Sequence, residues 1–178
     1  MTARILIEGR PGSGKTTAAR RLAELIRRRG LAPAGFTTEE IRRGSTRQGF
    51  TVEDLGGRRE TLAHVDLRGP PRVGKYGVDL EAFERVALPA LGDARRADVA
   101  VIDELGKMEL ASGAFREAVE DLFERDVPVA ATVHAFRHPL TDALKRRSDV
   151  EVVKLSARNR DRLPEDLAAL LSGRALSR

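Results

Sequence analysis

The chain has 178 residues, which suits one domain with one sizeable core, and only 4% of them are aromatic, so that core must be aliphatic. It contains no cysteine, which excludes disulfides, thiolate metal sites and cysteine nucleophiles. The formal net charge is +5, with 27 Arg and 5 Lys, but the arginines are spread along the chain. Nucleic acid is therefore an open but not a favoured partner.

The N-terminal residues lead directly into an apolar strand at residues 3–8, so we expect no signal peptide. No apolar run approaches the length of a membrane span, and we expect a cytoplasmic protein without a membrane partner. Strands and helices then alternate, which predicts an α/β fold in three layers, with a central, mostly parallel sheet flanked by helices. We expect one domain over residues 1–178.

Hydrophobic periodicity, glycine stops and N-terminal capping residues place the individual elements. Strands are expected at residues 3–8, 99–103, 127–133 and 150–155. Helices are expected at residues 16–29, 79–94, 112–125, 139–147 and 164–171. Asp79 is the expected N-cap of the second helix, and Pro89 is expected to bend that helix or end it early.

Residues 35–64 break this alternation, because short apolar runs are separated by Gly44, Gly49 and the pair Gly56-Gly57. This pattern predicts a small antiparallel insertion of two or three strands joined by tight turns. Residues 65–77 contain two prolines and three glycines and are expected to form a loop.

The segment GRPGSGKT at residues 9–16 matches the pattern G-x-x-x-x-G-K-[ST] between a strand and a helix. Glycines at 9, 12 and 14 are expected to allow positive φ, so that backbone N–H groups can surround phosphates. Lys15 would place a positive charge on the β- and γ-phosphates, and Thr16 would offer a hydroxyl to Mg²⁺. With the adjoining Thr17, the expected phosphate-binding residues are Gly9, Arg10, Pro11, Gly12, Ser13, Gly14, Lys15 and Thr16.

Asp103 and Glu104 end the apolar strand VAVID, where the ligands of open parallel sheets bind. Asp103 can reach a Mg²⁺ ion beside Thr16, and Glu104 can orient or deprotonate a water aimed at the γ-phosphate. Glu104 could instead cap the next turn or pair with an arginine. Lys107, in the turn that follows, could neutralise charge on the transferred phosphoryl group or could be a solvated surface lysine.

Two further segments are candidates for nucleotide contacts. After the last strand, Asn159 could hydrogen-bond a purine edge and Arg160 could stack on the ring, or Asn159 could support a turn. Loops that could close over the triphosphate carry Arg42, Arg43, Arg47, Arg72, Lys75 and Tyr76. His134 ends a strand and can reach the edge of the site, but the three histidines lack the spacing of a metal site.

Four segments in this order resemble one known family: GRPGSGKT at 9–16, GFTTEEIR at 35–42, VGKYGVDL at 73–80 and IDELGKME at 102–109. The chain resembles the small P-loop nucleoside-triphosphatases known from thermophiles, also called the cancer-related nucleoside-triphosphatase family. This resemblance implies a P-loop NTPase fold and Mg²⁺-dependent hydrolysis of ATP, GTP and other nucleoside triphosphates to the diphosphate and phosphate, with broad base tolerance. We therefore expect ATP, GTP, CTP and UTP as substrates. The resemblance also implies nucleotide contacts at residues 9–16 and at about 99–106, which include Gly106, and it adds weight to Lys107.

Three functions are compatible with these residues. In the first, a nucleoside-triphosphatase, Lys15 and Mg²⁺ stabilise charge, Thr16 and Asp103 hold the metal, and Glu104 activates water. The second is a nucleotide or nucleoside kinase, in which a hydroxyl or phosphate replaces water. The third is a nucleotide-switched module that binds nucleic acid or a protein partner, and the basic composition would favour nucleic acid. Glu104 and the family resemblance favour the triphosphatase.

Overall fold

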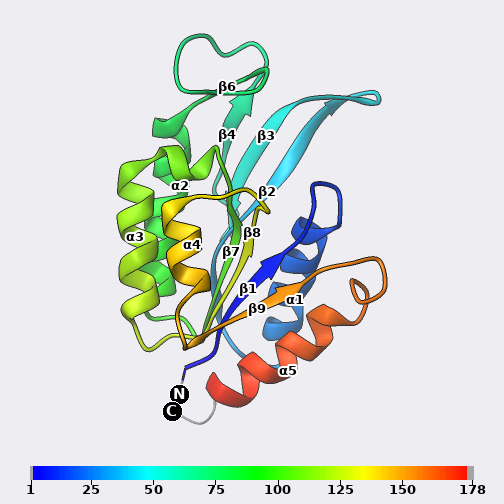
Figure 1. The fold of residues 1–178 in the computed structure, drawn as a ribbon, viewed down its shortest axis with the longest axis vertical. Coiled ribbons are helices and arrows are strands. Elements are labelled where there is room, and N and C mark those ends of the chain that lie inside the picture. Colours follow the sequence, from blue (N-terminus) through cyan, green and yellow to red (C-terminus); the bar gives the residue numbers. More distant parts are fainter. Residues whose placement is uncertain (1, 176–178) are drawn as a thin grey trace.

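The computed structural model describes residues 2–175, and nine strands within this range form one continuous sheet (Figure 1). Its strand order is β5-β6-β4-β3-β2-β7-β8-β1-β9. The strands are β1 (Arg4–Glu8), β2 (Pro33–Arg43), β3 (Thr46–Asp54), β4 (Arg59–His64), β5 (Arg72–Val73), β6 (Tyr76–Val78), β7 (Val99–Leu105), β8 (Val129–Val133) and β9 (Val150–Lys154). The helices are α1 (Lys15–Arg28), α2 (Leu80–Ala94), α3 (Gly113–Glu124), α4 (Pro139–Lys145) and α5 (Leu163–Ala175), with a short 3₁₀ helix η1 (Glu109–Ala111).

The sheet has a parallel half and an antiparallel half, and β2 belongs to both. Residues 33–36 of β2 run parallel to residues 99–102 of β7, and the sheet continues in parallel through β8, β1 and β9. The rest of β2 pairs antiparallel with β3, which is followed by β4, β6 and β5. The expected α/β fold and the antiparallel segment are confirmed, but that segment extends the main sheet instead of standing apart from it.

Helices cover both faces of the parallel half, with α1 and α5 on one side and α2, α3 and α4 on the other (Figure 1). Side chains of a strand alternate between faces, so the apolar residues at the start of β7 divide between two cores. Ala100 and Ile102 join the core under α2 and α3, whereas Val99 and Val101 join the core under α1 and α5. Burial on both faces explains why this strand is an unbroken apolar run in the sequence.

The expectation of a loop over residues 65–77 is wrong, because β5 and β6 form a small hairpin there. The turn between them contains Gly74 at φ 57°, and Val73 pairs with Tyr76. These strands have two and three residues, so they are too short to show the alternation that identifies a strand in a sequence. The hairpin adds its edge to β4 and extends the antiparallel half.

Two local expectations for α2 have different outcomes. The carboxylate of Asp79 accepts a hydrogen bond from the backbone N–H of Ala82 at 2.9 Å, which confirms the N-cap. Pro89 lies inside the helix, which nevertheless runs on to Ala94 and so does not end early.

No helix within residues 2–175 is long and apolar enough to cross a lipid bilayer.

Candidate active site

The loop between β1 and α1 supplies the first part of the site. Gly12 and Gly14 have φ of 76° and 98°, as expected, but the expected positive φ at Gly9 is wrong. A different constraint acts at Gly9: a Cβ there would lie 2.4 Å from the hydroxyl oxygen of Ser13, so that hydroxyl would have to rotate away. That hydroxyl oxygen is buried and has no hydrogen-bond partner among the described residues. The loop therefore has the tight curvature and the backbone N–H groups that phosphates require.

Lys15 begins α1 and is only 7% exposed. Its ammonium group donates to the backbone oxygens of Gly9 at 2.9 Å and Arg10 at 3.3 Å. It also lies 3.8 Å from a carboxylate oxygen of Glu104. The cation is thus held inside the curve of the loop, where the N-terminus of α1 adds a positive partial charge.

Asp103 is fully buried near the end of β7 and receives three hydrogen bonds. The hydroxyl of Thr132 donates to Oδ1 at 2.6 Å, while the N–H and the hydroxyl of Thr38 donate to Oδ2 at 3.2 and 3.1 Å. Burial raises the pKa of Asp103, as does the charge of Glu104, whereas hydrogen bonds from Thr132, Thr16 and Thr38 lower it. A cation beside this carboxylate would offset the cost of its burial.

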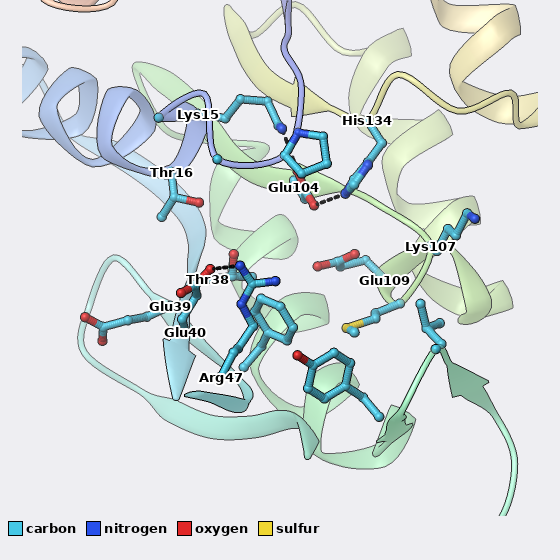
Figure 2. A pocket seen from close by; sticks show the side chains of 18 of the residues that line it. Lys15, Thr16, Thr38, Glu39, Glu40, Arg47, Glu104, Lys107, Glu109 and His134 are labelled. Atoms are coloured by element: carbon cyan, nitrogen blue, oxygen red, sulfur yellow. Dashed lines mark ion pairs between the residues drawn. The ribbon is translucent and has the colours of Figure 1, made fainter. Parts of the chain in front are cut away.

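Glu104 points into the cavity from the same strand (Figure 2). His134, which follows β8, lies with Nε2 2.8 Å from its Oε1, and Lys15 lies near its other oxygen. Glu104 therefore has His134 and Lys15 as partners, rather than an arginine or a helix cap. The sequence placed His134 only at the edge of the site, because its contact with Glu104 depends on the adjacency of β7 and β8.

Glu109, on η1, is a site residue that sequence reasoning missed. It lines the cavity and is 4% exposed, and burial, together with the charge of Glu104, raises its pKa well above the ordinary value. Gly106 makes room for both carboxyl groups, since a Cβ there would lie 2.7 Å from Glu109 and 2.9 Å from Glu104. The available signal was a charged residue next to the buried Leu110, within the matched segment IDELGKME.

These groups border one cavity of about 580 Å³. Figure 2 shows Lys15 and Glu104 at one end and Arg47 at the other. From the P-loop the lining includes Pro11, Gly12, Gly14, Lys15, Thr16 and Thr17, and its other walls contain Thr38, Glu39, Glu40, Arg47, Phe50, Val73, Gly74, Tyr76, Glu104, Lys107, Met108, Glu109 and His134. Lys107 thus borders the cavity, and its ammonium lies 5.1 Å from the centre of the ring of Phe136, which is not a lining residue.

The loop after β9 does not line this cavity. The side chain of Asn159 accepts from the N–H of Ser156 at 2.8 Å and donates to the backbone oxygen of Lys154 at 2.9 Å. This is the turn-supporting arrangement that the sequence left open. Neither Asn159 nor the exposed Arg160 lines the cavity, and their contact with a base stays a prediction.

The polar groups at the P-loop end fit a magnesium ion. The hydroxyl of Thr16 lies near enough to Asp103 to lower the pKa of that carboxyl, so two oxygen ligands, the type that Mg²⁺ prefers, are close together. Within residues 2–175 no cluster of three His, Cys, Asp or Glu side chains could hold a metal ion. A site with few protein ligands suits Mg²⁺, which usually keeps several waters and binds substrate phosphates.

A family model described as NTPase matches residues 4–168. This chain belongs to the NTPase family. Nucleoside-triphosphatase THEP1 of Thermotoga maritima is 41% identical over 169 residues, with 94% of this chain and 95% of the relative covered. Nucleoside-triphosphatase THEP1 of Methanosarcina acetivorans is 43% identical over 167 residues, with 92% and 94% covered.

Two solved structures share the fold of this NTPase family member. The crystal structure of THEP1 from Aquifex aeolicus aligns with a TM-score of 0.86 and 36% identity, covering 94% of this chain and 98% of that one. The solution structure of a human cancer-related nucleoside triphosphatase aligns with a TM-score of 0.81 and 34% identity, covering 97% and 98%. The resemblance drawn from the four sequence segments is confirmed.

Proposed function

We propose that this nucleoside-triphosphatase hydrolyses ATP, GTP, CTP and UTP, with Mg²⁺, to the diphosphate and phosphate. The observation that carries the proposal is the position of the Glu104 carboxylate, 3.8 Å from the Lys15 ammonium and beside the buried Asp103. A phosphate-binding cation and a carboxylate that can accept a proton thus face the same small volume. Names of relatives from bacteria and archaea describe the same class of enzyme.

In the proposed reaction the backbone N–H groups of the P-loop surround the phosphates. Lys15 exchanges the carbonyl oxygens of Gly9 and Arg10 for oxygens of the β- and γ-phosphates. Thr16 and Asp103 would hold Mg²⁺, which supplies positive charge that neutralises the phosphate oxygens. Thr38 and Thr132 keep the Asp103 carboxylate in place.

Glu104 acts as the general base in this proposal. It accepts a proton from the attacking water while the oxygen of that water bonds to the γ-phosphorus, and the diphosphate leaves with the bridging oxygen. His134 positions Glu104 through their 2.8 Å contact. Lys107, which borders the cavity, stabilises charge on the transferred phosphoryl group.

Broad base tolerance is expected because the loop after β9 offers a base few free polar groups. The strand order places β9 beside β1 on the side away from β7, and the loop after β9 carries Asn159 and Arg160. If the base lies over this loop, it meets an exposed Arg160 and an Asn159 already used in a turn. Such a surface can stack on any base but distinguishes poorly between base edges.

Phosphate release from the four nucleoside triphosphates, each with and without Mg²⁺, tests the proposal. We expect release from all four with Mg²⁺, rates within about tenfold of one another because one pocket contact discriminates only weakly, and loss of release in EDTA. Bound nucleotide without release of phosphate, or release that is unchanged by EDTA, would contradict it.

A further inference from the structure

The cavity extends well beyond the position proposed for the terminal phosphate. Lys15 and Glu104 meet on the side of the P-loop that faces β8 and β7, which places the γ-phosphate there and the base toward β9. The cavity lining comes from the P-loop, α1, β2, β3, β5, β6, β7 and η1, with Gly74, Lys107, Met108 and His134, and none of it from the loop after β9. The cavity therefore continues from the P-loop toward β3, β5 and β6, on the side from which an acceptor would attack.

The far end of the cavity has apolar and aromatic walls. We call this end the outer compartment, and its residues are Phe50, Val73, Tyr76 and Met108. The rings of Phe50 and Tyr76 are 5.4 Å apart and nearly perpendicular. Water needs no such surface, whereas flat ring systems bind against aromatic side chains and Met.

The carboxylates that line this end already have arginine partners, so they offer no free anion to a cationic occupant. Arg47 pairs with Glu40 at 2.5 Å and lies over the Phe50 ring at 5.3 Å. Glu39 is paired with Arg20 and Arg59. Of the cations that line the cavity, Lys15 and Lys107 are assigned to the ATP phosphates and Arg47 is held by Glu40. A second phosphate would need a further cation, so the outer compartment is better suited to a hydroxyl-bearing acceptor than to a nucleotide.

We propose that the outer compartment binds a nucleoside, and that a hydroxyl of this nucleoside replaces water as acceptor of the terminal phosphoryl group. The ring packs against Phe50 and Tyr76, while the sugar hydroxyls meet the carboxyl groups of Glu104 and Glu109 at the inner end. The proposal rests on the proposed function, because that function places the γ-phosphate.

The transfer follows the hydrolytic chemistry with one change. The hydroxyl oxygen of the nucleoside bonds to the γ-phosphorus as the bond from that phosphorus to the β,γ-bridging oxygen breaks. The bridging oxygen leaves with the diphosphate and its electron pair, and the hydroxyl proton passes to Glu104 and then to solvent. The products are a nucleoside monophosphate and a nucleoside diphosphate.

The chain offers a direct probe of binding, because Tyr76 is its single tyrosine. Incorporation of 3-fluorotyrosine gives one ¹⁹F resonance that reports on the outer compartment. We expect adenosine, guanosine, cytidine or uridine to shift it saturably with a Kd below about 1 mM, also in the presence of a non-hydrolysable ATP analogue and Mg²⁺. No saturable shift from any of the four, or displacement of the nucleoside by the ATP analogue, would overturn the proposal.

Transfer is measured with [γ-³²P]ATP and the nucleoside that binds best. We expect labelled nucleoside monophosphate, with its ratio to labelled phosphate at least tenfold lower in Tyr76→Ala and retained in Tyr76→Phe. The distant exposed variant Leu170→Ala should keep the wild-type ratio. Absence of labelled monophosphate would overturn the acceptor role. Phosphate release without nucleoside binding would support hydrolysis and refute this inference. Saturable nucleoside binding without phosphate release would support the nucleoside site and refute hydrolysis.

Discussion

The parallel and antiparallel halves of the sheet hold their polar groups in different ways. In the parallel half Asp103 is fully buried, and its oxygens accept hydrogen bonds from Thr132 and, across the junction with the other half, from Thr38 on β2. In the antiparallel half Glu39 is 41% exposed and pairs with arginines at the surface. A buried carboxylate without partners is costly, so the first arrangement must be complete, whereas exposed pairs contribute little. Chemistry is therefore built on the half with rigid polar contacts.

The largest expected effect comes from the cation at the centre of the parallel half. Lys15→Ala removes the ammonium that faces both the loop and Glu104. We expect phosphate release to fall by about 10²–10³-fold or more, measured at saturating ATP and Mg²⁺. Lys154→Ala, at an exposed lysine on the edge strand β9, is the matched control and should stay within about twofold, since exposed surface changes have small effects. Equal losses in both variants would remove the special role of Lys15.

A glycine at the junction between the two halves should be the most sensitive position for stability. Gly35 has φ 129°, and a Cβ there would lie 1.9 Å from the backbone oxygen of Val101. We expect Gly35→Ala to lower the free energy of unfolding by about 3 kcal/mol or more, measured by urea denaturation. Gly92→Ala in α2, where an added Cβ meets nothing within 4 Å, should instead stabilise by about 0.5–1 kcal/mol. Similar effects of both changes would show that the close approach of β2 and β7 is unimportant.

One pair of threonines compares the two halves directly. The hydroxyl of Thr132 donates to Asp103, whereas the buried hydroxyl oxygen of Thr51 in β3 has no partner among the described residues. Thr132→Val should cost about 1–3 kcal/mol of stability because the carboxylate loses a donor, and should raise the Mg²⁺ concentration needed for half-maximal activity. Thr51→Val should be neutral or slightly stabilising. The same loss of stability in both variants would contradict this contrast.

The smallest effect is expected at the exposed carboxylate of the antiparallel half. Hydrogen bonds from Arg20 and Arg59 lower the pKa of Glu39 below its ordinary value. Its contribution is therefore present above the pKa of the unfolded chain and is lost as pH falls through the pKa of the folded state. After allowance for screening by solvent, Glu39→Gln should cost below about 1 kcal/mol at pH 7. Urea denaturation at pH 7 and pH 3 should show that this difference becomes smaller in acid; an undiminished difference would contradict the pairing.

Sequence reasoning was most successful for elements whose residues follow one clear pattern over several positions. β7 is an unbroken apolar run because helices cover both of its faces, and the P-loop has a fixed pattern because each position has a chemical role. The hairpin of β5 and β6 was missed because two- and three-residue strands carry no periodicity. Gly9 was misinterpreted because its constraint is a contact with Ser13 rather than a dihedral angle.

The partners of the site residues could not be predicted from the sequence for a different reason. Thr132 and His134 reach Asp103 and Glu104 only because β8 lies beside β7, and strand order is a property of the whole chain. Glu109 is buried on η1 beside the cavity, although charged residues are usually exposed. The position of Glu109 within the matched segment IDELGKME therefore indicates a site residue, whereas its residue type alone does not.

Separating nucleotide binding from turnover at Glu104 tests the central claim most directly. Glu104→Gln keeps the size of the side chain but removes its ability to accept a proton, and Glu165→Gln on α5 is the matched exposed control. The measurements are ATP affinity by calorimetry and single-turnover phosphate release, both with Mg²⁺. We predict that Glu104→Gln binds ATP with a Kd within about fivefold of wild type and releases phosphate about 10²–10⁴-fold more slowly, while Glu165→Gln matches wild type in both. Phosphate release at the wild-type rate in Glu104→Gln would contradict the account.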